Sequence, residues 1–385
     1  MSLRIVSIFG TRPEAVKMAP VVWRLARTPG VEPHVIVTAQ HRQMLDQVLD
    51  LFDITPEVDL NLMQPNQGLA ELTASILTRL DPVLKRLQPD WVLVQGDTTT
   101  VMATALLCYY NRIQVGHVEA GLRTGDKWQP FPEEINRRIA SVAADLHFAP
   151  TEHSRQNLLH EGVPDWRIVV TGNPVIDALQ QIVDRPAPPE TIQLLDRFGI
   201  RPGGRQLVLV TAHRRENFGA PLEGICQGLR RLAEAYPDRL QLIYPVHLNP
   251  NVQEPVNRLL SGVPNISLLP PMDYLPMVHL MKRAALVLTD SGGIQEEATS
   301  LRVPTLVLRQ VTERPEGVTA GVLKLVGTDP ETIFNESRRL LEEPTAAQTM
   351  VAAQNPFGDG HAAERIVKAV LDYPQNRDAK RSAER

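Results

Sequence analysis

The feature that most constrains the fold of this 385-residue chain is an alternation of short β-branched runs with longer amphipathic stretches. Extended runs stand at residues 5–9, 35–37, 91–94 and 114–117. Helical patterns lie between them, for example at residues 15–27 and 69–87. Because a strand that feeds a helix returns to a parallel strand by a right-handed crossover, this spacing predicts a parallel sheet covered by helices.

The same alternation then starts again, which predicts a second domain of the same kind. Its extended runs stand at residues 206–210, 240–244, 286–289 and 305–308. A proline-rich stretch at 185–189 and the pair Gly203 and Gly204 separate the two series, so we place the crossing between residues 173 and 202. The sequence predicts an α/β fold with doubly wound domains at 1–175 and 176–361, a helix at about 362–373, and a frayed polar tail at 374–385.

Bulk properties exclude several classes of protein. A formal net charge of -4 leaves no broad basic surface for nucleic acid. Cys108 and Cys226 lie alone in apolar stretches, where cysteine is usually a small buried hydrophobe, so no disulfide framework is expected. No apolar run approaches the roughly 18 residues of a membrane span, and the N-terminal run is too short for a signal peptide. We expect a cytoplasmic protein.

Two doubly wound domains that face each other would enclose a cleft at the carboxyl ends of their strands, where such sheets bind ligands. The first strand is followed by Gly10-Thr-Arg-Pro-Glu14. Thr11 and Glu14 have capping-box spacing, so a helix begins here, with Arg12 beside its terminus and Lys17 one turn further on. The segment fits an anion site, but a well-capped helix with solvated cations explains it equally.

A second candidate anion site is Asp290-Ser-Gly-Gly-Ile-Gln-Glu-Glu297, after the run at 286–289. Gly292 and Gly293 at a helix start allow a phosphate to approach the backbone, and Ser291 adds a hydroxyl donor. A tight turn that needs small residues is the alternative. We favour a diphosphate, because Glu297 beside a phosphate site suits a ligand with a ribose diol.

Other cofactor motifs do not occur in the sequence. There is no G-x-G-x-x-G after a strand, no G-x-x-x-x-G-K-[ST] and no H-E-x-x-H. The ten histidines show no metal-ligand spacing. We therefore expect no bound metal and no cofactor.

Carboxylates at expected strand ends are the candidates for acid–base chemistry. Asp97 lies in Gln95-Gly-Asp97, Glu119 in His117-Val-Glu-Ala-Gly121, and Glu133 in Pro132-Glu-Glu134. Each alone could be a helix cap or a member of an ion pair. Three in one domain favour general acid–base catalysis, which needs carboxyls with different pKa values.

His213 directly follows the first strand of the second series and precedes Arg214 and Arg215. A lone histidine is more often structural than catalytic. Its place after a strand and beside two cations favours a site that holds the pyrophosphate of a leaving group.

Together these segments resemble the bacterial non-hydrolysing UDP-N-acetylglucosamine 2-epimerases. The matching segments, in chain order, are Phe9-Gly-Thr-Arg-Pro-Glu-Ala15, Gln95-Gly-Asp97, His117-Val-Glu-Ala-Gly-Leu-Arg-Thr-Gly-Asp126, Pro132-Glu-Glu134, Gly172-Asn-Pro-Val-Ile-Asp177, His213-Arg-Arg-Glu-Asn217, His247-Leu-Asn-Pro250, Asp290-Ser-Gly-Gly-Ile-Gln-Glu-Glu297 and Thr312-Glu-Arg-Pro315. Each motif alone is weak, but their order from near residue 5 to near residue 320 makes the resemblance specific.

The resemblance implies a GT-B-like enzyme, a homodimer, and a C-terminal helix that packs back on the first domain. It implies that Asp97, Glu119, Glu133 and His213 are catalytic. It implies substrate contacts at Arg12, Lys17, Arg137, Ser291, Gly292, Gly293, Glu297 and Arg314. Bacterial members are activated by a second substrate molecule, for which Gln40, Gln43, Arg214 and His247 are candidates; Asn66 stands where some relatives carry arginine.

The implied reaction is the reversible interconversion of UDP-N-acetylglucosamine and UDP-N-acetylmannosamine at C2, in a pathway for envelope polysaccharide. UDP is eliminated to leave 2-acetamidoglucal and is then added back. Three alternatives share the expected fold: a GT-B glycosyltransferase, a hydrolysing 2-epimerase and a catalytically silent UDP-sugar sensor. The full set of carboxylates argues against the sensor.

Overall fold

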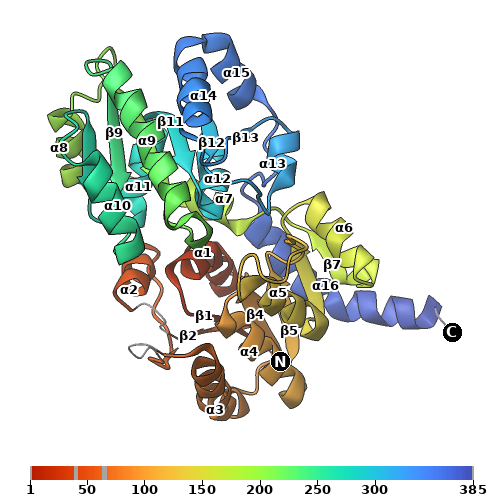
Figure 1. The fold of residues 1–385 in the computed structure, drawn as a ribbon. Coiled ribbons are helices and arrows are strands. Elements are labelled where there is room, and N and C mark those ends of the chain that lie inside the picture. The colour runs from red at the N-terminus through yellow and green to blue at the C-terminus, as the bar shows by residue number, and fades with distance from the viewer. Residues whose placement is uncertain (1, 39–41, 63–66, 384–385) are drawn as a thin grey trace. The chain divides into compact units, whose positions relative to one another are not determined.

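The computed structural model describes residues 2–38, 42–62 and 67–383, and it divides into two compact units. Unit 1 comprises residues 1–180 and 357–385, and unit 2 comprises residues 181–356. Both are built on parallel sheets covered by helices (Figure 1), which confirms the predicted α/β class.

The sheet of unit 1 has seven parallel strands in the order β3-β2-β1-β4-β5-β6-β7. The strands are β1 (Leu3–Phe9), β2 (Val31–Val37), β3 (Val58–Asp59), β4 (Trp91–Gln95), β5 (Gln114–Val118), β6 (Leu146–Ala149) and β7 (Ile168–Val170). β1 and β4 are buried at nearly every position, as expected for strands covered on both faces. The strand order reverses between β1 and β4, which is where doubly wound sheets bind ligands.

Two helical layers enclose this sheet. The helices are α1 (Arg12–Ala26), α2 (Arg42–Leu51), α3 (Leu69–Leu87), α4 (Thr99–Asn111), α5 (Glu133–Ala143), α6 (Glu152–His160), α7 (Pro174–Ile182) and α16 (Ala362–Ala383). α3, α4 and α5 pack side by side in one layer, whereas α1 packs between α2 and α16 in the other. Leu80, Leu84 and Val101 belong to the core between the first layer and the strands.

Unit 2 repeats the plan with six parallel strands in the order β10-β9-β8-β11-β12-β13. The strands are β8 (Gln206–Thr211), β9 (Leu240–Pro245), β10 (Ile266–Leu269), β11 (Ala284–Thr289), β12 (Thr305–Val307) and β13 (Leu323–Leu325). The helices are α8 (Pro189–Arg197), α9 (Ala220–Ala235), α10 (Pro250–Leu260), α11 (Tyr274–Arg283), α12 (Gly292–Ser300), α13 (Pro315–Thr319), α14 (Pro330–Glu342) and α15 (Pro344–Ala352). α9 packs between α10 and α14 (Figure 1), and α11 contacts α8.

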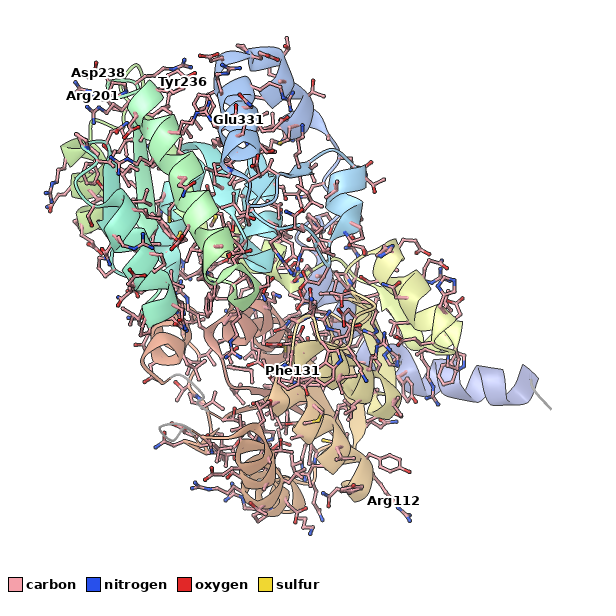
Figure 2. All side chains as sticks on the ribbon, in the orientation of Figure 1. Arg112, Phe131, Arg201, Tyr236, Asp238 and Glu331 are labelled. Atoms are coloured by element: carbon pink, nitrogen blue, oxygen red, sulfur yellow. The ribbon has the colours of Figure 1, made fainter. Side chains whose placement is uncertain are left out.

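The two ends of each parallel sheet differ in what they carry. Arg201, Tyr236 and Asp238 precede β8 or β9 and gather at one end of unit 2 (Figure 2). In unit 1, Arg112 precedes β5 and Phe131 follows it, and the two lie at different ends of the unit (Figure 2). The catalytic candidates Asp97, Glu119 and His213 each follow a strand, so they lie at the carboxyl ends of the two sheets.

The boundaries of the units differ slightly from those expected at 175 and 361. Residues 176–180 and 357–361 belong to unit 1 because α7 binds the segment that precedes α16. The Asn173 amide donates to the Phe357 carbonyl at 2.8 Å, and Asp177 accepts from the first amides of α16, Ala362 at 3.2 Å and Ala363 at 2.8 Å.

The last helix also differs from the expected frayed tail, because α16 continues to Ala383. Residues 375–383 contain mostly good helix formers such as Gln, Arg, Ala and Lys, whose helical propensity outweighs the lack of apolar residues. Among the described residues, no helix combines the length and the apolar character that crossing a membrane requires.

Candidate functional site

The turn after β1 is held by a buried carboxylate. The capping box of Thr11 and Glu14 forms as predicted. Glu14 accepts from the backbone N–H groups of Gly10 at 2.9 Å and Thr11 at 2.7 Å, and from the Thr98 hydroxyl at 2.7 Å. Burial raises the pKa of Glu14, and these hydrogen bonds oppose the rise. Glu14 therefore joins the loop after β1 to the loop after β4.

Little room surrounds this turn. A Cβ added to Gly10 would lie 2.0 Å from the Thr38 hydroxyl oxygen, so a side chain there would force the turn to move. Arg12 begins α1 and is partly buried.

Glu119, which follows β5, is surrounded by donors from three other segments. Lys17 Nζ lies 2.6 Å from Oε1 and 2.7 Å from Oε2. The Asn173 side-chain amide donates to Oε1 at 2.8 Å, and the Gln95 amide donates to Oε2. The side chains of Lys17 and Glu119 are only 10% and 5% exposed, so this is a buried, hydrogen-bonded ion pair. The arrangement holds the Glu119 carboxylate in one orientation.

The backbone of Glu119 is strained as well. Its φ of +63° lies in the left-handed region, which a residue with a Cβ rarely adopts. Such strain costs about 1–3 kcal/mol and persists where the surroundings determine the conformation, as they often do at functional sites.

Asp97, which follows β4, is held by the start of α5. Arg137 Nη2 donates to Asp97 Oδ2, and the Asn136 side-chain amide donates to the Asp97 carbonyl at 3.0 Å. The Asp97 side chain is 29% exposed, whereas the Arg137 side chain is only 5% exposed. Two residues that the sequence analysis selected separately are therefore an ion pair.

Glu133 and Glu134 begin α5 and have different environments. Glu133 is partly buried. Glu134 is fully buried and accepts from the N–H groups of Thr124 at 3.2 Å and Gly125 at 3.4 Å, and from Arg137 at 3.3 Å. Glu134 thus holds the loop that follows β5 against the start of α5, and it fixes the helix turn that carries Glu133.

His117 supports the same edge of the sheet from inside. Its ring lies 2.7 Å from the Gly96 carbonyl through Nε2, which therefore donates. Burial lowers the pKa of His117 to about 4, so the ring is neutral near pH 7. His117 holds the backbone next to Asp97.

In unit 2, the loops after β8 and β11 are joined by the buried Asp290. Its Oδ2 accepts from the N–H groups of His213 and Arg214, both at 2.8 Å, and from the Asn217 side-chain amide at 3.0 Å. The His213 ring stacks on His247, with centroids 5.3 Å apart and planes 13° apart. The structure thus places His247, a candidate for the activating site, against the ring of His213, a candidate catalytic residue.

The start of α12 carries the expected glycine pair. Arg314 Nε donates to Glu296 Oε1 at 2.6 Å, and a Cβ on Gly292 would lie 2.4 Å from Arg314 Nη1. The guanidinium therefore lies against the first turn of α12, where only glycine leaves room for it. Ser291 is the N-cap residue, and the buried Glu297 lies on the same helix next to Gly293. A helix N-terminus with an adjacent guanidinium is a site for an anion.

The sequence analysis quoted most of the residues that hold these groups in place as parts of motifs, but it did not assign this role to them. They are Glu14, Gln95, Glu134, Asn173, Asp290, Glu296, Arg309 and Glu313. Arg309 Nη1 lies 2.7 Å from Glu313 Oε2, and Arg309 Nη2 lies 2.9 Å from Glu216 Oε1. Burial would raise the pKa of Glu313, but the charges of Arg309 and Arg314 lower it below its usual value. For Gln95 and Asp290, the available signal was a polar side chain at the end of an otherwise apolar strand.

Part of the predicted activation site lies outside the described residues. Gln40 and Asn66 lie outside the described residues, and only the backbone of Gln43 is described, in α2. Lys17, expected to contact substrate, directs its ammonium to Glu119.

Two doubly wound Rossmann-like units in one chain, one with carboxylates at its strand ends and one with a helix terminus and arginines, define a GT-B-like enzyme of the nucleotide-sugar class. The family model for UDP-N-acetylglucosamine 2-epimerase matches residues 24–371. The UDP-N-acetylglucosamine 2-epimerase of Salmonella typhimurium is 55% identical over 96% of this chain and 99% of its own length.

Solved structures agree with this assignment. The UDP-GlcNAc 2-epimerase of Neisseria meningitidis, bound to UDP-GlcNAc, has a TM-score of 0.92 at 47% identity, covering 96% of this chain and 100% of that one. The enzyme of Methanocaldococcus jannaschii, in complex with UDP-GlcNAc and UDP, has a TM-score of 0.83 at 34% identity, with the same coverage. The chain belongs to the UDP-N-acetylglucosamine 2-epimerase family, as the resemblance implied, and to its bacterial, non-hydrolysing type.

The ion pair of Lys17 and Glu119 gives a prediction about stability. Lys17→Met leaves a buried carboxylate without its cation and should destabilise unit 1 by about 3–5 kcal/mol, whereas adding Glu119→Gln should recover much of this loss. Urea unfolding followed by tryptophan fluorescence measures it, because all four tryptophans lie in unit 1. Equal losses in the single and double variants would show that the two side chains do not interact.

Proposed function

We propose that this enzyme interconverts UDP-N-acetylglucosamine and UDP-N-acetylmannosamine by eliminating UDP to 2-acetamidoglucal and adding it back. Membership of the family supports the overall reaction. The observation that carries the mechanism is the set of strand-end carboxylates in unit 1, where Glu119 is fixed by Lys17 and Asp97 by Arg137.

The chemistry of C2 explains why elimination is needed. No carbonyl lies beside C2, so its hydrogen is not acidic in the intact sugar nucleotide. Breaking the bond between C1 and the diphosphate oxygen builds positive charge at C1, and this charge makes the C2 hydrogen removable by a carboxylate. Returning a proton to the other face and UDP to C1 gives the epimer. The enzyme must therefore stabilise UDP as a leaving group and place proton carriers at both faces of C2.

We assign proton transfer at C2 to Glu119 and Glu133. Asp97 orients the sugar or shares that task. Lys17 acts on the reaction by holding Glu119, with Nζ 2.6 Å from Oε1 and 2.7 Å from Oε2, which fixes the orientation of this carboxylate. Arg137 acts on Asp97 in the same way.

We assign the contacts with UDP mainly to unit 2. His213 stabilises or protonates the departing phosphate, and Arg314 with the first turn of α12 binds the diphosphate. Ser291, Gly292, Gly293 and Glu297 are the further candidate contacts in unit 2, and Arg12 is the candidate in unit 1. The buried pair of Arg314 and Glu296 supports this assignment, because it fixes the guanidinium against a helix N-terminus.

We further propose that the enzyme works in the cytoplasm, in envelope polysaccharide synthesis, and that a second substrate molecule activates it. Both cysteines are free thiols, which suits a reducing compartment. Arg214 and His247 are the described candidates for the activating site, and the stacking of His247 on His213 supports a link to catalysis.

One experiment tests the reaction and separates it from the alternatives. When the enzyme is incubated with UDP-N-acetylglucosamine in D2O without an acceptor, mass spectrometry and NMR should show deuterium at C2 of an intact UDP-sugar pool. Free N-acetylmannosamine would instead indicate a hydrolase. A sugar nucleotide that keeps its original C2 hydrogen would indicate a transferase or a sensor.

Variants of the carboxylates test their roles. Asp97→Asn, Glu119→Gln and Glu133→Gln should each lower turnover by roughly 10²–10⁴-fold, because each removes a proton carrier or an orienting group. UDP affinity, measured by calorimetry, should change little, whereas His213→Ala should lower both affinity and turnover. The exposed Glu71→Gln on α3 is the matched control. Normal turnover in one of the three variants would remove that residue from the mechanism.

We also propose a homodimer formed by α4 and α5, which pack side by side. Ile135, Ile139 and Val142 have the spacing of one helical face, yet all three are exposed, Val142 by 90%. Tyr109 and Tyr110 on α4 are exposed as well. Large exposed apolar side chains on two neighbouring helices suit a protein interface.

Val142→Asp should convert the dimer to a monomer, because an aspartate at this face would bury a charge in an apolar interface. Light scattering coupled to size exclusion measures the mass. Ile192→Asp, an exposed apolar position on α8 in unit 2, is the control and should remain dimeric. A dimer in both variants would place the interface elsewhere.

A further inference from the structure

Asp290 has more bonding capacity than its loop uses. Its side chain is fully buried at the end of β11, and Oδ2 alone accepts all three loop donors, the N–H groups of His213 and Arg214 and the amide of Asn217. The other oxygen, Oδ1, is buried and makes no hydrogen bond with any described residue. It lies 3.9 Å from Nδ1 of the His213 ring.

We propose that Asp290 is a positioning residue for His213. Its Oδ1 accepts a hydrogen bond from Nδ1–H of the ring, so that Nε2 is presented to the departing phosphate. This inference rests on the proposed role of His213. The 3.9 Å separation is longer than a hydrogen bond, and catalytic hydrogen bonds often tighten when substrate binds.

The tautomer decides what His213 can do. A neutral imidazole donates through one nitrogen only. With the proton of Nδ1 directed at Asp290, a neutral ring offers Nε2 only as an acceptor, which a phosphate oxygen does not need. When the ring is protonated, Nε2–H donates to that oxygen and can transfer its proton to it. Asp290 therefore selects the orientation in which protonation of His213 is useful.

The charges around the ring agree with this role. Burial lowers the pKa of His213, and the charge of Asp290 raises it. His247 from the segment after β9, together with Arg214 and Glu216 on the loop of His213 itself, are the other charged or titratable groups that face the ring. Arg214 and His247 lower the pKa, whereas Glu216 raises it. Of the two carboxylates, Asp290 acts more strongly on the ring.

Asp290→Asn tests the proposal with little change in shape. The amide oxygen in the place of Oδ2 still accepts the three loop donors. The amide NH2 then takes the place of Oδ1 and donates to His213 Nδ1, which moves the ring proton to Nε2. The loop keeps its bonds while the tautomer reverses.

The first measurement locates the ring proton of His213 directly. In the neutral form of the full-length wild-type enzyme, ¹⁵N NMR of the histidine rings, with His213 assigned through His213→Gln, should show Nδ1 protonated. In Asp290→Asn the proton should lie on Nε2. A wild-type ring protonated at Nε2 would overturn the proposal, even if the variant fails to fold.

Kinetics then separate positioning from a purely structural role. Asp290→Asn should lower kcat for C2 deuterium exchange by roughly 10²–10⁴-fold while KM changes little. The alkaline limb of the pH profile should move to lower pH, because without the charge of Asp290 the ring loses its proton earlier. Asn217→Ala, which removes a loop bond but no charge, should lower Tm and leave both the tautomer and this limb in place.

The outcomes distinguish this inference from the proposed function. If the wild-type enzyme exchanges C2 hydrogen and Asp290→Asn does so at the same kcat with the same pH profile, Asp290 does not position His213. If the wild-type enzyme itself does not exchange, the proposed function fails, and the tautomer measurement still decides whether Asp290 sets the orientation of the ring.

Discussion

The buried ion pair of Lys17 and Glu119 is the interaction on which the proposed chemistry of unit 1 depends. It joins α1 to the end of β5, and the amides of Gln95 and Asn173 complete the set of donors around the carboxylate. A buried pair of this kind adds little net stability, because the cost of removing two charges from water offsets their attraction. Its effect is geometric. A strained, left-handed Glu119 stays in one conformation because three other segments bond to it.

Both units use the same physical device to order the loops at the carboxyl ends of their strands. A buried carboxylate accepts several backbone N–H groups from a loop, as Glu14 and Glu134 do in unit 1 and Asp290 does in unit 2. Loops lack the repeating hydrogen bonds of strands and helices, so their buried amides need such acceptors. Each of these carboxylates also contacts a segment that carries a candidate functional residue. The same hydrogen bonds therefore order the loops and position the candidate catalytic groups.

Much of the fold could be predicted from local pattern. The eight extended runs named from the sequence all lie within observed strands or extend them by one residue, and the helix expected at 69–87 has those bounds. Short edge strands such as β3 and β13 were missed, because two or three residues carry no periodic signal. In the candidate site, Asp97, Glu119 and His213 could be selected because charged residues directly after buried strands are unusual. Glu14 and Asp290 were seen only as parts of motifs, because their burial and multiple donors depend on distant segments.

By itself, the sequence determined the α/β class, the two-unit plan, the helix starts at Thr11 and at the glycine pair, and the family resemblance. These follow from hydrophobic period, capping chemistry and residue order, all of which are local or linear. Only the tertiary structure decided that Lys17 pairs with Glu119 across 102 positions, that Arg137 pairs with Asp97, and that Asp290 lies against His213. The reason is that a parallel sheet brings the ends of strands distant in sequence to one edge, and the partners of a buried charge are set by that edge rather than by chain neighbours.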